Sequence, residues 1–140
     1  MNKRVFEWRP EYEIDGDIID WEHKKLFDLA NGIITIDRTR EREAEIKAII
    51  KEFFDYVRYH FDHEEAFMAA KGYPALEDHQ EKHALIIAEM NQYLTSATHL
   101  TQLLSRFRQL AHKWVVSHIM DEDRKIRIFL EEAKGSAPTS

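Results

Sequence analysis

The chain of 140 residues is long enough for one domain that buries about two-thirds of its unfolded surface, and it requires no second domain. Hydrophobic residues make up 44% and charged residues 33%, as in proteins rich in amphipathic helix, while 4 Gly and 3 Pro are too few for the turns of an all-β fold. The formal charge of −6 argues against nucleic acid or an anionic membrane as the main partner.

Cysteine is absent from the chain, which excludes disulfides, thiolate metal sites and Cys nucleophiles. A chain without Cys suits the cytoplasm, which is the location we expect. The sequence shows no secretory signal, and no segment approaches the roughly 18 uninterrupted apolar residues of a membrane span.

Residues 1–17 mix aromatic, acidic and Pro residues without a helical period, which predicts an extended N-terminal arm. Phe6, Trp8 and Tyr12 are expected to pack this arm onto the rest of the protein. After the arm, residues recur at spacings of three and four, the pattern of one helical face. The residues on this face of the first helix are Ile19, His23, Leu26, Phe27, Ala30, Ile33 and Ile34.

A second helix is expected after the polar run at 37–43, and it ends at a Gly-Tyr-Pro turn that begins with Gly72. Its inward face includes His60 and Glu64 among apolar residues. A third helix begins near Ala75. The inward face of the second helix comprises Ile46, Ile49, Ile50, Phe53, Val57, His60, Phe61, Glu64, Phe67 and Met68, and that of the third comprises Leu76, His79, His83, Ile86, Ile87, Met90 and Leu94.

A fourth helix follows a weak break at 95–102 and carries His118 on its inward face. Four helices with short connections predict an all-α fold, an up-down-up-down four-helix bundle. We expect the arm at 1–17, the bundle at 18–133 and a disordered tail at 134–140.

The stretch from His60 to His83 carries the chemistry of the chain. His60 and Glu64, like His79 and His83, are four residues apart and share a helical face, so each pair can point at one ion. Imidazole with carboxylate favours ions such as iron or manganese. A lone inward His is more often a hydrogen-bonded core residue, but five on four helices are costly to bury unless a shared metal pairs with them.

The spacing leaves open which acid after His118 would complete the site. Glu122 is four residues on, whereas Asp123 is five residues on and is rotated by about 140° in an α-helix. Helical geometry therefore slightly favours Glu122. The other three histidines, His63, His99 and His112, miss the inward faces and are expected at the surface.

Four segments together resemble the hemerythrin family, in particular the single-domain bacterial hemerythrins, from about Trp8 to Leu130. The segments are DWEHKKLF at 20–27, HFDHEEAFM at 60–68, HQEKH at 79–83 and WVVSHIMDED at 114–123. The family's spacing selects Asp123 over Glu122.

The resemblance implies a cofactor of two iron ions joined by an oxo or hydroxo bridge, with O₂ as its ligand. Five imidazoles, two bridging carboxylates and the bridge leave one position of two octahedra open, on the iron with two His. The implied ligands are His79, His83 and His118 for one iron, His23 and His60 for the other, and Glu64 and Asp123 as bridges.

The implied function is reversible O₂ binding, by an oxygen carrier, store or supplier with no catalytic residues. The rival readings are a di-iron oxidase, peroxidase or nitric-oxide-handling enzyme, and a redox or O₂ sensor that acts through a separate partner. No protein partner is indicated by the sequence.

The resemblance also places Val115, Trp114 and Phe61 at the O₂ pocket. Val115 stands where the family commonly has Leu, and a smaller wall is expected to admit solvent and speed autoxidation. Glu22 and Glu122 are candidates for carboxylates that support a ligand histidine from outside, although an exposed acid at a helix start is the commoner role for a residue such as Glu22.

Overall fold

Helices make up nearly all of the chain that the structure describes. The computed structural model describes residues 8–14, 17–36, 42–97 and 99–135. Within these ranges it contains no strand, which confirms the all-α prediction. The elements are η1 (Pro10–Tyr12), α1 (Asp17–Ile34), α2 (Glu43–Lys71), α3 (Leu76–Ser96), α4 (Leu100–Leu110), η2 (Ala111–Val116), η3 (Ile119–Asp123) and α5 (Arg124–Gly135).

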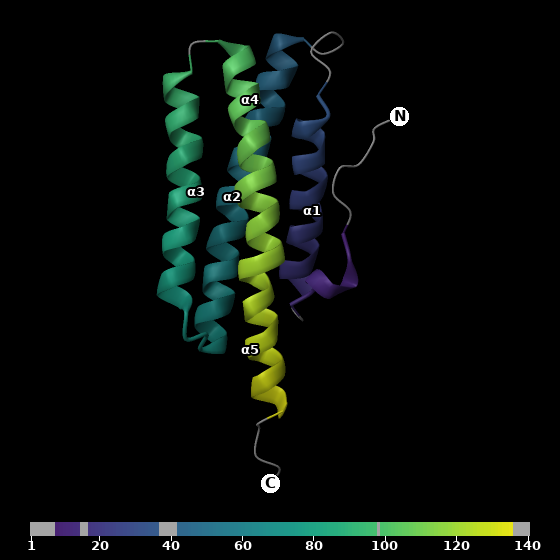
Figure 1. Ribbon diagram of the computed structural model, residues 1–140, viewed down its shortest axis with the longest axis vertical. Helices are drawn as coiled ribbons and strands as arrows, with labels where there is room; N and C mark the ends of the chain where they lie inside the picture. The colour runs from purple at the N-terminus through teal and green to yellow at the C-terminus, as the bar shows by residue number, and fades with distance from the viewer. Residues whose placement is uncertain (1–7, 15–16, 37–41, 98, 136–140) are drawn as a thin grey trace.

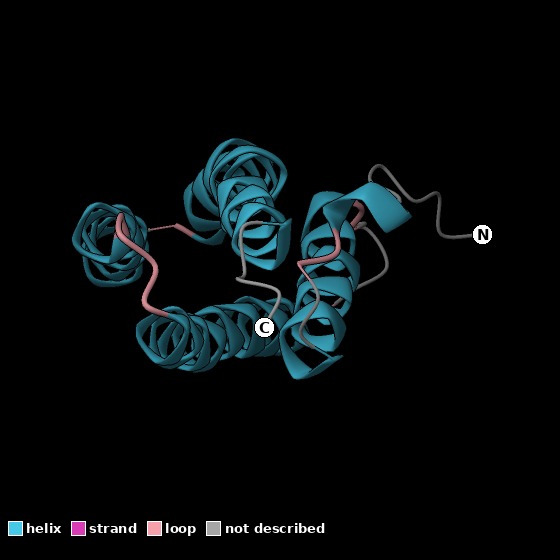
Figure 2. Ribbon diagram, turned by 90° about the horizontal axis from the view of Figure 1, so that it is seen from below, coloured by secondary structure: helices cyan, strands magenta, loops and turns pink. Residues whose placement is uncertain are grey.

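The helices form the predicted four-helix bundle. Helices α1, α2 and α3 are three of its rods, and α4, η2, η3 and α5 continue one another as the fourth (Figure 1). Successive rods run in opposite directions, and the end-on view shows them around a common interior (Figure 2). In the described ranges, none of the helices combines the length and the apolar character that crossing a membrane requires.

The turn between α2 and α3 forms where Gly-Tyr-Pro was expected to end the helix. Gly72 has a φ of 68°, in the left-handed region, and its N–H donates to the carbonyl oxygen of Ala69 at 3.2 Å. The N–H of Tyr73 donates to the carbonyl oxygen of Met68 at 3.0 Å. This closed turn sets α3 antiparallel to α2, so that residues near the two helix ends face each other.

The fourth rod departs from α-helical geometry at two places, a feature that the residue spacing did not predict. Segments η2 and η3 are π-helical, and His118 lies between them. A π-helical turn holds an extra residue and brings positions five apart onto one face. Such turns are frequent at functional sites.

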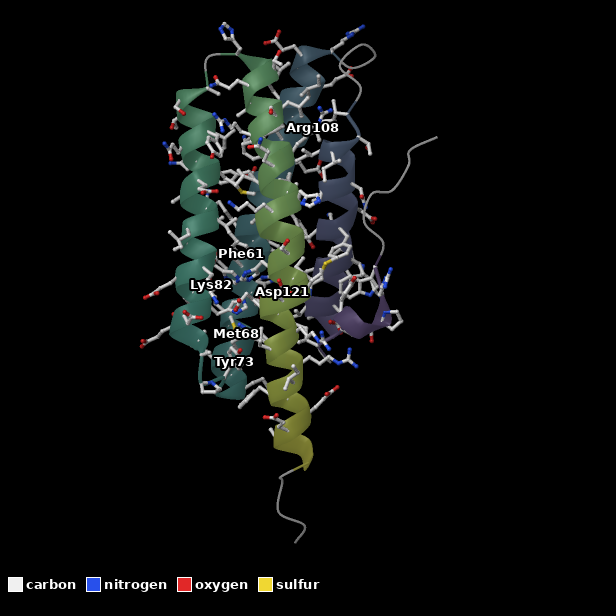
Figure 3. The ribbon with its side chains drawn as sticks, in the orientation of Figure 1. Phe61, Met68, Tyr73, Lys82, Arg108 and Asp121 are labelled. Carbon is white, nitrogen blue, oxygen red and sulfur yellow. The ribbon has the colours of Figure 1, made fainter. Side chains whose placement is uncertain are left out.

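The apolar core consists of two clusters at different heights along the bundle. On α2, the larger cluster includes Val57 and Phe61, while the smaller one includes Met68, so Glu64 falls between them. Figure 3 shows the labelled side chain of Phe61 above those of Met68 and Tyr73. The polar groups in the middle of the bundle are therefore sealed by apolar side chains above and below.

The N-terminal arm packs onto the bundle through the aromatic residues that were predicted to do so. The ring centroids of Trp8 and Phe27 are 5.3 Å apart, and those of Tyr12 and Phe27 are 5.7 Å apart. Ile14 is completely buried in the smaller apolar cluster. The predicted contact of Phe6 lies outside the described residues.

Candidate metal centre

The seven side chains predicted as metal ligands meet in the middle of the bundle. Helix α1 supplies one of them, α2 and α3 supply two each, and the fourth rod supplies two around η3. Each has a relative exposure of 6% or less. They are His23, His60, Glu64, His79, His83, His118 and Asp123.

These side chains form two overlapping groups, each able to surround one ion. Within a group, the candidate ligand atoms lie within 4.8 Å of one another. The groups share both carboxylates, but one has three imidazoles and the other has two. The three-histidine group is Glu64, His79, His83, His118 and Asp123, and the two-histidine group is His23, His60, Glu64 and Asp123.

Glu64 divides its two oxygens between the two groups. Oε2 lies 2.7 Å from Nε2 of His23 and 3.1 Å from Nε2 of His60. Oε1 lies 2.8 Å from Nε2 of His79 and 3.1 Å from Nε2 of His83. A carboxylate with one oxygen directed at each group has the arrangement needed to bridge two ions.

Asp123 is divided in the same way. Its Oδ2 lies 3.1 Å from Nε2 of His23, and its Oδ1 lies 2.9 Å from Nε2 of His79 and 3.4 Å from Nε2 of His118. Both oxygens are buried, yet neither has a hydrogen bond of acceptable geometry. Buried carboxylate oxygens are normally satisfied, so these two atoms are oriented for a different kind of partner.

The imidazole nitrogens of the three-histidine group also converge on one point. Nε2 of His118 lies 3.0 Å from Nε2 of His79 and 3.1 Å from Nε2 of His83. At a metal–nitrogen distance of about 2.1 Å, two ligands at right angles lie about 3.0 Å apart. The spacing of these nitrogens is therefore compatible with a shared metal ion, and the shared carboxylates make the whole cluster compatible with a di-iron site.

Without metal, the cluster is a set of buried ion pairs. Burial alone would lower the pKa of His23, yet contacts with Asp123 and Glu64 raise that pKa to about 10, and the same carboxylates raise the pKa of His79 to about 10. Burial alone would raise the pKa of Glu64, but the surrounding imidazoles hold it well below its ordinary range. A bound metal requires neutral imidazole, so metal binding releases protons.

The raised histidine pKa values predict how the metal-free protein responds to pH. In the unfolded chain His23 and His79 lose their protons near 6.5, but in the folded protein they keep them up to about 10. Their contribution to stability is therefore complete below pH 6.5 and is lost as the pH rises through about 10.

We expect the thermal unfolding midpoint of the metal-free protein to fall across this pH window. The metal-loaded protein, whose imidazoles are neutral, should show a smaller fall because it has no such protons to lose. Scanning calorimetry of both forms across the window measures the difference. If the unfolding midpoint of the two forms fell in parallel with pH, the assignment of His23 and His79 as metal ligands would be contradicted.

The choice between Glu122 and Asp123 is explained by the π-helical turn η3. The turn places Asp123, five residues after His118, in the core at 1% exposure. Glu122 instead lies nearer the outside, where Lys82 donates to it at 2.8 Å and Lys125 at 3.2 Å. The spacing argument assumed an α-helix, whereas this segment is π-helical, and the side-chain contacts described for Glu122 are with Lys82 and Lys125 and not with a candidate ligand histidine.

Two further carboxylates hold candidate ligands from outside. Nδ1 of His60 donates to Oε1 of Glu22 at 2.9 Å, and Nδ1 of His83 donates to Oε2 of Glu65 at 2.9 Å. These bonds fix the ring orientation and leave Nε2 free to bind a metal. Glu22 is 1% exposed, which rules out the exposed helix-start role and agrees with the supporting role. Glu65 was missed, although it follows Glu64 directly at the edge of the inward face.

Because Glu22 supports the two-histidine group and Glu65 the three-histidine group, their removal should weaken different metal sites. Glu22→Ala and Glu65→Ala are each expected to lower the affinity for one of the two ions about 10–100-fold. Dialysis against a chelator followed by iron analysis should leave each single variant with one tightly held ion and the double variant with none. Loss of both ions in either single variant would contradict the assignment of Glu22 and Glu65 to different metal sites.

Phe61 is the described member of the predicted O₂ pocket. Its ring stacks on that of His83, with centroids 3.7 Å apart and planes 1° apart, and its centroid lies 6.1 Å from that of His60. The side chains of Trp114 and Val115 lie outside the described residues. In Figure 3 the label of Phe61 lies slightly above the labels of Lys82 and Asp121 along the bundle.

The expected surface histidines divide into two kinds. His99 and His112 are exposed, as predicted. The side chain of His63 is 42% exposed, but its Nδ1 donates to the buried Oε2 of Glu22 at 2.7 Å. His63 is therefore linked to the cluster, a connection that the residue spacing did not indicate.

The core of this helical bundle holds two overlapping groups of histidines that share their carboxylates. These features place the chain in the class of helical-bundle proteins that can bind two metal ions. The sequence agrees with this class. Residues 16–127 match the family described as Hemerythrin, the hemerythrin HHE cation binding domain, and the chain belongs to that family.

Relatives from several bacteria extend the similarity over most of the chain, and each carries the name bacteriohemerythrin. One from Clostridium acetobutylicum is 29% identical over 126 residues, which are 86% of this chain and 98% of the relative. One from Campylobacter jejuni is 27% identical over 120 residues, which are 85% of this chain and 90% of the relative. One from Stenotrophomonas maltophilia is 26% identical over 117 residues, which are 84% and 76% of the two chains.

Proposed function

We propose that this chain binds O₂ reversibly at a non-heme di-iron centre and acts in the cytoplasm as an oxygen carrier, store or supplier. The observation that carries the proposal is the unequal pair of overlapping groups, one with three imidazoles and one with two. The family membership and the bacteriohemerythrin relatives support the same function.

The inequality matters because it decides where a small ligand can bind. His79, His83 and His118 with the shared carboxylates and a bridging oxygen would complete one octahedron. His23 and His60 with the same shared groups would leave one position open on the other ion. The proposed O₂ position is therefore on the side of His23 and His60.

When bound, the two ferrous ions would supply two electrons to O₂ and recover them on its release. The protein groups favour this reversible exchange over enzymatic oxidation. Neutral imidazoles donate less negative charge than the carboxylate-rich sites of other di-iron bundles, so they favour high-valent iron less. We therefore propose a binding protein and not an enzyme.

The surrounding residues would keep water away from the open position. Trp8 in the arm packs beside His23, with ring centroids 6.1 Å apart, and Phe61 packs beside His60. Both lie in or against the larger apolar cluster. Apolar walls of this kind would limit the access of solvent to a ligand at that position.

Metal analysis tests the proposed cofactor. Purified protein reconstituted anaerobically with ferrous iron should hold two irons per chain. Its NMR spectrum should show the imidazole resonances of the five ligand histidines shifted by the paramagnetic iron. A chain that binds a single zinc in preference to two irons would contradict the proposal.

A further inference from the structure

One buried carboxylate connects the exposed ring of His63 to the two-histidine group. The side chain of His63 is 42% exposed, and its Nδ1 donates to Oε2 of Glu22 at 2.7 Å. The other oxygen of Glu22 accepts from Nδ1 of His60 at 2.9 Å. These three side chains form a continuous hydrogen-bonded path from solvent to His60, a candidate ligand of the ion that would have the open position.

Aromatic side chains surround the outer end of this path. The ring centroid of Tyr59 lies 4.1 Å from that of His63, and the centroid of Tyr56 lies 5.8 Å from that of Tyr59. Nζ of Lys25 lies 4.7 Å from the Tyr56 centroid and 5.7 Å from the Trp21 centroid. Trp21 is 61% and Tyr59 51% exposed, and the adjoining groove has a volume of about 590 Å³.

We propose that His63 is the point at which electrons enter to return an oxidised centre to its ferrous state, passing through Glu22 to His60. The inference rests on the di-iron function proposed above. The donor is a planar aromatic one-electron reductant, for which the exposed rings offer a stacking surface.

In each transfer the donor loses one electron and one ferric ion becomes ferrous. A second donor molecule reduces the second ion. No covalent bond of the path is made or broken, and the path itself carries no proton in this step. A carrier whose iron slowly autoxidises needs such a route, because the ferric protein cannot bind O₂.

The corresponding contact on the other side of the cluster is less suited to this role. Glu65, which accepts from His83, is 25% exposed and presents a carboxylate to solvent. A carboxylate has no extended π system on which a planar donor could stack. His63 presents an aromatic ring, so the two-histidine side is the better entrance.

Reduction of the ferric protein by reduced methyl viologen, followed by stopped-flow absorption, tests the proposal. His63→Ala is expected to slow reduction about tenfold, with the reduction potential unchanged. Because His63 is partly exposed, the variant should fold. Added imidazole, which can occupy the space left by the ring, should restore part of the rate. His99→Ala is the control, since it removes an exposed histidine outside the described contacts of the site.

A second readout uses the metal-free protein. The ring resonances of His60 should shift in His63→Ala, because Glu22 links the two rings. Equal reduction rates in the native protein and His63→Ala, a slower rate explained by a changed potential, or no shift of the His60 resonances would each overturn the proposal. A native protein that binds two irons and O₂ while His63→Ala is reduced at the native rate would refute only this inference, whereas a native protein without iron would refute the proposed function as well.

Discussion

Glu64→Ala is expected to lose both metal ions. Glu64 directs one oxygen at His23 and His60 and the other at His79 and His83, so its removal takes a ligand from both sites at once. The metal-free variant should also be less stable by about 3–5 kcal/mol, because buried histidines lose their charge partner. Iron analysis and chemical denaturation measure the two effects.

His63→Ala is the matched control, since the residue precedes Glu64 and also carries a hydrogen bond to a buried group. It should keep two irons per chain. If Glu64→Ala retained both irons, or if His63→Ala lost them to the same extent, the bridging assignment of Glu64 would be wrong.

Asp123→Ala and Glu122→Ala should differ sharply although the residues are neighbours. Asp123 has both oxygens in the cluster and should be required for binding both ions. Glu122 pairs with Lys82 and Lys125 near the surface, so its replacement should cost about 0–1 kcal/mol of stability and leave the iron content unchanged. Iron loss in Glu122→Ala with retention in Asp123→Ala would contradict the π-helical placement.

The bundle could be predicted from the sequence because its inward faces are long and regular. Ile46, Val57 and Met68, for example, share one face of α2 at helical spacing and are all buried. Gly72 and Pro74 mark the turn by their backbone chemistry. The same periodicity carried His60 and Glu64 into the core, so the meeting of the candidate ligands followed from the helical pattern together with the family resemblance.

Features that depend on backbone irregularity or on contacts between helices could not be predicted in this way. Asp123 is turned inward by η3, and a 3.6-residue period cannot anticipate a π-helical turn. Glu22 and His63 meet across α1 and α2, 41 positions apart in the chain. Their pairing depends on how the two helices pack side by side, which the pattern of each helix alone does not specify.

The most direct test of the central proposal is a cycle of oxygenation followed by visible absorption. The purified protein is reduced anaerobically, O₂ is admitted, the spectrum is recorded, and O₂ is then removed. Reversible binding predicts a coloured adduct that disappears on deoxygenation and forms again in the next cycle. Immediate, irreversible oxidation with release of peroxide would contradict it and favour a di-iron oxidase.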